Sequence, residues 1–289
     1  MSHVPVLKTV ADVRKRVAEW RAAGSSVALV PTMGNLHEGH LSLARRAAQT
    51  ADKVVLSIFV NPTQFGPNED FAAYPRTLDE DRASVEREGT VQALFVPAET
   101  DIYPFGSAEA VRVTLPPLST ELCGASRPGH FDGVATVVLR LLNIVTPDVA
   151  VFGEKDYQQL ILVERMVADL SVPVRILRAP IVREPDGLAM SSRNRYLTPD
   201  ERARAPALHA ALEGAAAALR GGEADYARVE ARAKEALLRA GFRPDYVEVR
   251  DAADLAKPRA GGGAPLIVLG AAWLGRARLI DNVRVPPHG

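Results

Sequence analysis

The chain has 289 residues, of which 47% are hydrophobic and 24% are charged. This composition is typical of a globular protein with a sizeable core, and it excludes a disordered or fibrous chain. The 35 basic and 35 acidic side chains cancel, whereas a protein that grips a nucleic-acid backbone usually carries a basic excess, so we expect no nucleic-acid partner. At about 150 residues per domain, the length predicts two domains.

The sequence predicts a cytoplasmic protein without a membrane anchor. Its one cysteine, Cys123, cannot form a disulfide within the chain, which is typical of a reducing compartment. The N-terminal segment reaches Lys8 and Asp12 without an apolar stretch, so we expect no secretory signal. The longest apolar stretch, residues 264–275, is far shorter than the roughly 20 residues that span a bilayer.

Short apolar runs alternate with helical patterns over the first part of the chain. Continuous apolar strands that alternate with helices predict a parallel sheet covered on both faces. We therefore expect residues 1–181 to form one α/β domain. The predicted strands are residues 27–30, 54–60, 93–96, 149–152 and 174–177, and the predicted helices are 39–50, 78–88, 132–145 and 156–170.

The pattern changes near Ile181. Two helices rich in Ala, Arg and Glu are predicted at 199–220 and 224–240, and strands at 246–250, 266–269 and 278–285. Two helices with a few strands, which we expect to be antiparallel, favour a smaller α+β domain over residues 182–289. The chain contains neither a GxxxxGK[ST] phosphate loop nor a GxGxxG fingerprint, so a nucleotide would have to be bound by another device.

The string PTMGNLHEGH, residues 31–40, lies where a predicted strand ends and a helix begins. Ligands bind at this edge of open α/β sheets, a helix N-terminus attracts anions, and Gly34 and Gly39 let the backbone approach a ligand closely. His37 and His40 lie three residues apart on one face of the first turn, where two imidazoles can donate hydrogen bonds to phosphate oxygens. The alternatives are histidines that only cap the turn, or a metal pair without an evident third ligand.

Asn61 and Gln64 follow the second predicted strand in the string FVNPTQFG. Neutral amides suit a small hydroxylated substrate, because they orient it without trapping a carboxylate in a salt bridge. An Asn-Pro turn is the alternative interpretation, and it explains Asn61 and Pro62 but not Gln64.

Lys155 follows the strand at 149–152 in the string FGEKDYQQL. It is a compact cation suited to phosphate, while Asp156 is either a helix cap or a ligand of the ribose or of Mg²⁺. Gln159 lies one turn after Lys155, so both can face one cleft. A cation at the positive end of a helix is unfavourable without an anion, which favours a functional role for Lys155.

Ser191, Ser192 and Arg193 lie in a polar segment near the domain junction. Two hydroxyl donors followed by a guanidinium can clamp a triphosphate, and an ordinary polar loop is an equally good interpretation of the residues alone. The glycine-rich stretch 124–134 precedes a helix, so its Arg127 and His130 either meet the substrate or stabilise the loop.

These strings together resemble the pantothenate synthetase (pantoate–β-alanine ligase) family, and HEGH is similar to the HxGH motif of the nucleotidyltransferase superfamily. The ten-residue string 31–40, FVNPTQF, MSSRN, the stretch 123–134 and the closing ARLIDN spread the likeness over nearly the whole chain. The resemblance implies a Rossmann-like N-terminal domain, a smaller C-terminal α+β lid and a homodimer. It also implies ATP as co-substrate, Mg²⁺, and pantoate and β-alanine as substrates.

The resemblance implies a role for each matching residue. His40, His37, Lys155 and Arg193 are expected to be catalytic. Gln64 is expected to bind pantoate and β-alanine, and Gln159 pantoate, with Asn61, Arg127 and His130 beside them. Asp81 matches an acidic position near Mg²⁺, although acids at a helix start are common for dipole reasons alone. The residues expected to bind ATP are Met33, Gly34, Asn35, Leu36, His37, Glu38, Gly39, His40, Gly153, Glu154, Lys155, Asp156, Val182, Met190, Ser191, Ser192 and Arg193.

The implied reaction joins pantoate to β-alanine through a pantoyl adenylate, with AMP and pyrophosphate as the other products. Another nucleotidyltransferase acting on a phosphorylated acceptor is a rival, and it predicts cations where Gln64 and Gln159 stand. A binding module that has lost the reaction is a second rival, which the intact set of His37, His40, Lys155 and Arg193 disfavours.

Overall fold

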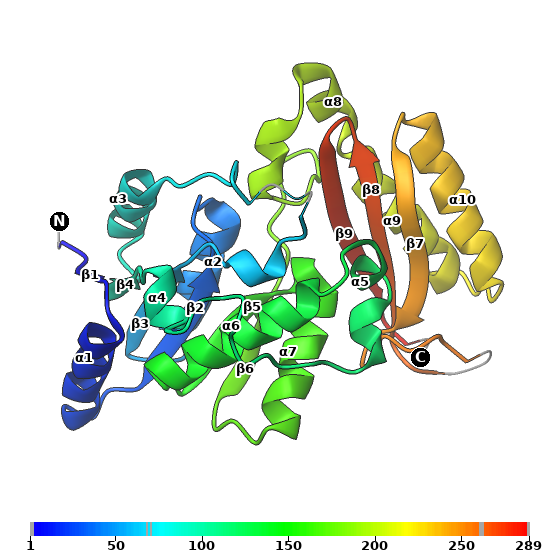
Figure 1. The fold of residues 1–289 in the computed structure, drawn as a ribbon. Coiled ribbons are helices and arrows are strands. Elements are labelled where there is room, and N and C mark those ends of the chain that lie inside the picture. The colour runs from blue at the N-terminus through cyan, green and yellow to red at the C-terminus, as the bar shows by residue number, and fades with distance from the viewer. Residues whose placement is uncertain (1–2, 68, 70, 260–262, 288–289) are drawn as a thin grey trace. The chain divides into compact units, whose positions relative to one another are not determined.

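The computed structural model describes residues 3–67, 69, 71–259 and 263–287, and the chain divides into two compact units. The sheet unit takes in the chain up to Glu154 together with Leu162–Pro180, and the C-terminal unit takes in Lys155–Ile161 and the chain from Ile181 onward. Figure 1 follows the elements of both in chain order. The predicted domain boundary between residues 181 and 182 stays a prediction.

The sheet unit is built on six parallel strands in the order β1-β4-β3-β2-β5-β6. Its inner strands carry near-continuous apolar runs because both faces are buried. This arrangement confirms the predicted α/β class. The strands are β1 (Val6–Leu7), β2 (Val27–Thr32), β3 (Lys53–Ile58), β4 (Ala93–Phe95), β5 (Val149–Gly153) and β6 (Arg175–Ala179).

Successive side chains of a strand point to opposite faces of the sheet, so a sheet that is buried on both faces needs helices on each side. Ala28, Val30, Val54 and Leu56 share one core cluster with Ala44 of α2. The residues between them in the strands are equally buried, and α1 and α6 contact each other and β2. The helices are α1 (Val10–Ala22), α2 (Glu38–Ala48), α3 (Leu78–Glu88), α4 (Glu99–Ile102), α5 (Cys123–Ser126) and α6 (His130–Val145), with 3₁₀ turns η1 (Pro62–Gln64) and η2 (Pro117–Thr120). The turn η3 (Glu154–Asp156) and the helix α7 (Tyr157–Asp169) are divided between the two units.

The order of the strands reverses direction between β2 and β5. From β2 the chain moves through β3 to β4 on one side, and it then returns to form β5 and β6 on the other side of β2. The crevice beyond the carboxyl ends of two such strands is the usual ligand site of an open α/β sheet. The turn after Thr32 and the residues at Gly153 therefore lie where a ligand is expected.

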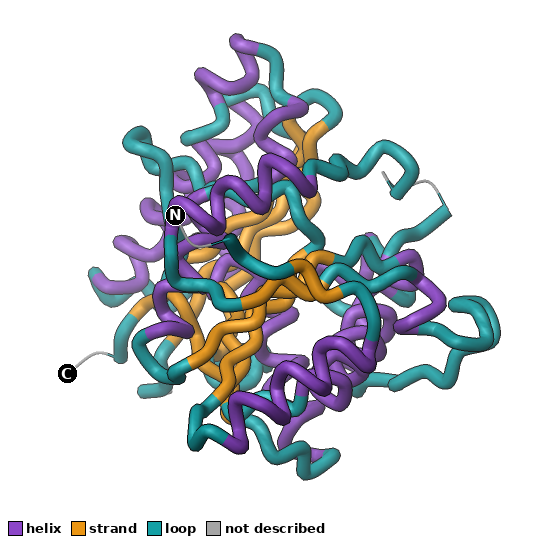
Figure 2. The backbone as a smooth tube through the Cα atoms, turned by 90° about the vertical axis from the view of Figure 1, so that its left-hand side faces the viewer, coloured by secondary structure: helices purple, strands orange, loops and turns teal. Residues whose placement is uncertain are grey.

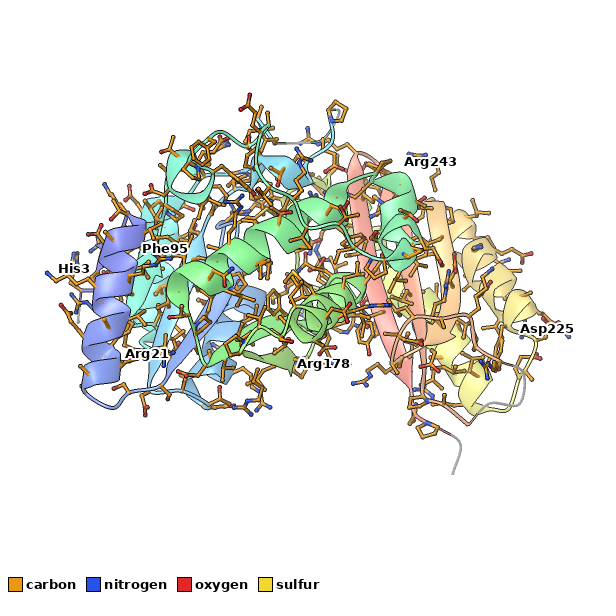
Figure 3. The ribbon with its side chains drawn as sticks, turned by 60° about the horizontal axis from the view of Figure 1, so that its bottom comes forward. His3, Arg21, Phe95, Arg178, Asp225 and Arg243 are labelled. Atoms are coloured by element: carbon orange, nitrogen blue, oxygen red, sulfur yellow. The ribbon has the colours of Figure 1, made fainter. Side chains whose placement is uncertain are left out.

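The C-terminal unit has a sheet of three antiparallel strands in the order β7-β8-β9. Helices α9 and α10 contact each other and this sheet, and their apolar faces share one core with the strands. Asp225 begins α10 by accepting a hydrogen bond from the Arg228 amide at 3.0 Å (Figure 3). The elements are η4 (Ser192–Tyr196), α8 (Pro199–Arg204), α9 (Ala207–Arg220), α10 (Tyr226–Arg239), β7 (Arg243–Asp251), β8 (Leu266–Leu274) and β9 (Ala277–Val285).

Two predictions about these elements are wrong or incomplete. The single helix predicted at 199–220 is two helices, because the ring of Pro206 cannot continue α8 and instead precedes α9. The predicted elements also miss β1 and α1, although Thr9 and Asp12 form a capping box at the start of α1.

The connections between these elements run as loops and turns, drawn in teal in Figure 2. Among the described residues, the structure contains no helix of the length and apolarity that crossing a bilayer requires.

Candidate functional site

His37 and His40 are built into the first turn of α2. His37 is the N-cap residue, and its Nδ1 accepts a hydrogen bond from the Gly39 amide at 3.2 Å. His40 occupies the third helical position, where its Nδ1 accepts from the His37 amide at 3.3 Å. The two rings lie 4.1 Å apart between centroids. The pair is therefore a capping box made of imidazoles.

Capping fixes the chemistry that these two rings can offer. A neutral imidazole whose Nδ1 accepts a hydrogen bond carries its proton on Nε2, which makes Nε2–H a donor. Both donors belong to the N-terminus of α2, where the helix dipole favours an anion. The two interpretations of the motif, a capped turn and an anion site, are thus compatible in one structure.

Asp81 holds the loop that leads into this turn. The side chain is 2% exposed, and its oxygens accept from the backbone amides of Asn35 at 2.9 Å and Leu36 at 2.7 Å, and from Thr77 Oγ1 at 3.2 Å. Burial raises the pKa of Asp81, and the hydrogen bonds from Leu36 and Asn35 oppose that shift. Asp81 acts as the acceptor around which residues 34–36 turn.

Gly34 leaves room for this contact. Its φ of +81° is in the left-handed region, and a Cβ there would lie 3.0 Å from Asp81 Oδ2 and 2.9 Å from Ile58 Cγ2. Only glycine meets both requirements.

The contacts of Asp81 bear on the expected magnesium ion. Oδ1 of Asp81 already accepts from Leu36 and Thr77 and Oδ2 from Asn35, which leaves about one lone pair, on Oδ2, for a metal. Among the described residues, no group of three or more His, Cys, Asp or Glu side chains is placed to hold a metal. The side chains present thus do not form a protein cage for the ion, and Mg²⁺ stays a prediction.

Replacing Asp81 with asparagine is expected to lower the free energy of unfolding by about 1–3 kcal/mol, because the amide NH₂ would face a buried N–H and leave it without an acceptor. Urea unfolding followed by circular dichroism measures this. Asp79→Asn is the matched control, since Asp79 lies exposed in the same helix turn and contributes less than about 1 kcal/mol through the helix dipole. Equal losses in the two variants would contradict the role of Asp81.

Asn61 sets the orientation of the Gln64 side chain. Asn61 is 1% exposed, its Nδ2 donates to the Gly133 carbonyl at 3.2 Å, and its Oδ1 accepts from the Thr63 amide at 3.4 Å. A carbonyl can only accept and an amide N–H can only donate, so these two contacts decide which way Asn61 faces. Its Nδ2 also donates to Gln64 Oε1 at 3.1 Å.

Gln64 therefore presents its NH₂ group away from Asn61. The side chain is 8% exposed, and Nε2 lies 3.1 Å from Sδ of Met33, in the loop that precedes His37. The residue expected to bind the acid substrates is thus in contact with the loop expected to bind ATP. A donor amide at this position suits a carboxylate or a hydroxyl oxygen of a substrate.

Tyr103 completes this arrangement and was not identified in the sequence. Its hydroxyl donates to Asn61 Oδ1 at 2.7 Å and lies 3.1 Å from Thr63 Oγ1. Burial raises the pKa of Tyr103, so its phenol stays protonated and able to donate. Nothing in the sequence near Tyr103 indicates this role, because its partner lies 42 positions earlier in the chain.

His130 and Arg127 support Gln64 from its backbone side. His130 is 8% exposed, and its Nδ1 lies 2.8 Å from the Gln64 carbonyl, which can only accept, so Nδ1 carries the proton. Its Nε2 then accepts from Arg127 Nη1 at 2.8 Å, and Arg127 forms a two-pronged pair with Glu69 at 2.8 and 2.5 Å. These contacts match the loop-stabilising interpretation, and direct contact with substrate stays a prediction.

Gly133 allows α6 to pack directly on the turn that carries Gln64. A Cβ on Gly133 would lie 2.2 Å from the Thr63 carbonyl oxygen and 2.8 Å from Gln64 Cα, and both are backbone atoms that cannot move aside cheaply.

Gly133→Ala is expected to cost about 3 kcal/mol of unfolding free energy and to displace Gln64. Gly214→Ala in α9 is the matched control, because a Cβ there meets nothing within 4 Å. That change is expected to stabilise the protein by about 0.5–1 kcal/mol, since alanine is the better helix former. Thermal unfolding of both variants measures the difference, and similar melting temperatures would refute the steric argument.

The segment after β5 begins in the sheet unit and enters the C-terminal unit at Lys155. Gly153 ends β5 beside α2, where its Cβ position is 3.7 Å from Leu43. Lys155 lies in the 3₁₀ turn η3, and its Nζ is 3.9 Å from Asp156 Oδ1. The helix predicted from Asp156 begins at Tyr157, so Lys155 lies in the short turn just before the N-terminus of α7. Gln159 follows in the first turn of α7, half-buried.

The remaining ATP candidates lie in the C-terminal unit. Val182 and Met190 are joined by a hydrogen bond from the Met190 amide to the Val182 carbonyl at 3.0 Å. Ser191 caps η4 by accepting from the Arg193 amide at 3.3 Å, and Ser192 and Arg193 are partly exposed beside it. Glu38 of the sheet unit lies on the outer side of α2, paired with Arg45.

The structure brings the expected site residues together in two groups. In the sheet unit, the imidazole pair, Met33, Asn61, Gln64 and Asp81 form one connected set. In the C-terminal unit, Lys155 and the segment 182–193 are each attached to β9, through Asn282 and Asp281. The convergence of Lys155 and Arg193 on the imidazole pair stays a prediction.

Comparisons with known proteins find relatives that match nearly the whole chain. The family model of pantoate–β-alanine ligases matches residues 5–284. The chain is similar to the pantothenate synthetase of Alkalilimnicola ehrlichii, at 57% identity over 96% of this chain and 97% of that one. Its fold is similar to the crystal structure of pantothenate synthetase from Thermus thermophilus, with a TM-score of 0.89, 45% identity and coverage of 98% and 100%. A pantoate–β-alanine ligase from Francisella tularensis, complexed with "Beta-gamma ATP" and β-alanine, gives a TM-score of 0.77 at 32% identity, with 97% of each chain covered.

Proposed function

Because the chain belongs to the pantoate–β-alanine ligase family and condenses pantoate with β-alanine using ATP, we propose that the reaction passes through a pantoyl adenylate. The observation that carries the proposal is the contact of Gln64 Nε2 with Met33 Sδ at 3.1 Å. A carboxylate held by Gln64 would lie beside the loop that holds the nucleotide, which is the placement that attack on the α-phosphorus requires.

In the first step, an oxygen of the pantoate carboxylate bonds to the α-phosphorus of ATP, and the bond to the bridging oxygen of pyrophosphate breaks. Negative charge grows on the phosphoryl oxygens and on the leaving pyrophosphate. The Nε2–H groups of His37 and His40 and the N-terminus of α2 would stabilise that charge as electrostatic donors. Lys155, Ser191, Ser192 and Arg193 are proposed to act on the same triphosphate.

In the second step, the neutral amine of β-alanine bonds to the acyl carbon, AMP leaves with the bonding electron pair, and the amine loses a proton. Gln64 and Gln159 are proposed to hold the pantoyl group. Closure of the C-terminal unit as a lid would exclude the water that otherwise hydrolyses the adenylate. The expected Mg²⁺ would neutralise phosphate charge.

Pyrophosphate release with pantoate, with and without β-alanine, tests this pathway. We expect a burst of one equivalent per site with pantoate and ATP, and steady turnover when β-alanine is added. Pantoate labelled with ¹⁸O in its carboxylate should transfer one labelled oxygen to AMP, since the adenylate contains that oxygen. Label in inorganic phosphate instead of AMP would show an acyl phosphate route. Pyrophosphate release that requires a phosphorylated acceptor would favour another nucleotidyltransferase.

We also propose that the protein works in the cytoplasm as a homodimer. The support for the dimer is the family resemblance, and for the compartment the buried thiol of Cys123, the one cysteine of the chain. Analytical ultracentrifugation tests the dimer, and a monomer at micromolar concentration would refute it. Cell fractionation tests the cytoplasmic location.

A further inference from the structure

Asp281 and Asn282 are adjacent residues of β9, in the closing ARLIDN segment. Both are 4% exposed. Successive side chains of a strand project to opposite faces, so the pair can reach two neighbours at once. Their partners, Arg183 and Lys155, lie 98 and 127 positions earlier in the chain.

Asp281 holds the segment that carries Val182 and Met190. Arg183 donates to its two carboxylate oxygens at 2.6 and 3.0 Å, and also to the Gly187 carbonyl at 3.0 Å. A two-pronged arginine–carboxylate pair fixes direction as well as distance. His209 Nδ1 lies 3.4 Å from Asp281 Oδ2. The backbone N–H of Asn282 donates to Asp281 Oδ1 at 2.7 Å.

Residues 182–190 form a short hairpin. Because its two sides are paired, the ion pair at Arg183 also holds the residues around Ala189. Arg183 and Ala189 are paired as a β-bridge, and the Glu184 amide donates to the Leu188 carbonyl at 2.8 Å. Ser191 follows directly. Ser191, Ser192 and Arg193 are therefore coupled to Asp281 through the Arg183 side chain and the backbone hydrogen bonds of the hairpin.

Asn282 holds the second segment. Its Nδ2 donates to the Lys155 carbonyl at 3.2 Å, in the turn η3. Two residues on, the Tyr157 hydroxyl donates to the Ala252 carbonyl at 2.7 Å, so residues 155–157 are held twice by the rest of the C-terminal unit.

We propose that Asp281 and Asn282 are positioning residues that hold Lys155 and the hairpin at 182–190 in one fixed arrangement for the triphosphate of ATP. This inference rests on the proposed function, because it takes Lys155 and Arg193 as ATP-binding residues. Asp281 and Asn282 are both buried, and their role is to position other residues. They act by keeping two cationic segments, distant in sequence, at the spacing that the nucleotide needs.

The test compares Asp281→Asn and Asn282→Ala with Asp245→Asn. Asp245 of β7 pairs with Arg278 of β9 at 2.7 Å in the same sheet, so its variant controls for the loss of an ion pair in this unit. Calorimetric ATP binding and the KM for ATP are measured alongside the KM for β-alanine. We expect both test variants to weaken ATP binding about 10- to 100-fold with the KM for β-alanine within twofold, and the control to stay within twofold throughout.

ATP affinities of both folded test variants within twofold of the control would overturn the inference, as would equal increases in the two KM values. Circular dichroism shows which variants fold, and if Asp281→Asn does not, Asn282→Ala decides alone. A wild-type protein that binds ATP but releases no pyrophosphate with pantoate would refute the proposed function, and the binding comparison would still decide the role of Asp281 and Asn282.

Discussion

Replacing His40 with alanine is expected to lower the rate of adenylate formation by about 10²–10³-fold, with pantoate affinity changed far less. The Nε2–H of His40 would meet charge that develops only as the α-phosphorus is attacked, so its loss affects the transition state more than the bound acid. Rapid-quench measurement of pyrophosphate formation gives the rate, and equilibrium binding of pantoate gives the affinity. An equal loss in both quantities would refute the assignment.

The capping contact of His40 requires a second variant. Alanine removes the acceptor for the His37 amide as well as the donor, so a slow variant could reflect an uncapped helix. Glutamate is a standard residue at the third position of a capping box, can accept from that amide and has no N–H to donate. His40→Glu is therefore expected to keep the wild-type melting temperature while the adenylation rate stays at least about 10²-fold low. Recovery of the rate by glutamate would assign the effect to capping.

The parallel sheet could be predicted because burial on both faces is visible in the composition of each strand. Val54 to Leu56 is apolar without alternation, which a half-exposed strand does not show. The two-residue strand β1 carries too little pattern to identify, since Val6 and Leu7 alone are compatible with any buried segment. The proline at position 206 indicates a helix break, but the strong helix formers on both sides of it favoured one continuous helix.

The candidate site was predictable in its residue types but not in its contacts. The motifs place histidines, amides and cations near the ends of strands, and the carboxyl ends of such strands are where open α/β sheets usually bind ligands. The roles of Asp81, Asn61 and His130 depend on partners 46, 72 and 66 positions away. A pattern in one segment contains no information about such partners. Residues that the sequence suggests for substrate or metal are therefore seen in the structure to hold their neighbours.

Gln64→Glu is expected to reduce pantoate-dependent pyrophosphate release by about 10³-fold, more than Gln64→Ala, for which we expect about 10- to 100-fold. The reason is the direction of the amide. Asn61 Nδ2 donates to Oε1, so the group presented toward Met33 is the NH₂ donor. Alanine only removes that donor, whereas glutamate replaces it with an oxygen that carries negative charge and repels the carboxylate of pantoate.

The pH dependence of the rate losses in Gln64→Glu and Gln64→Ala distinguishes an effect of the introduced charge from an effect of the altered side-chain shape. Lowering the pH protonates the introduced carboxylate and removes the repulsion, so the Gln64→Glu variant should recover part of its rate relative to wild type, while Gln64→Ala should not. The first half-reaction is the right measurement, because β-alanine must lose a proton to react and would add its own pH dependence to full turnover. A Gln64→Glu variant as active as Gln64→Ala at every pH would mean that Gln64 does not face the substrate carboxylate, and the orientation derived from Asn61 would then serve packing alone.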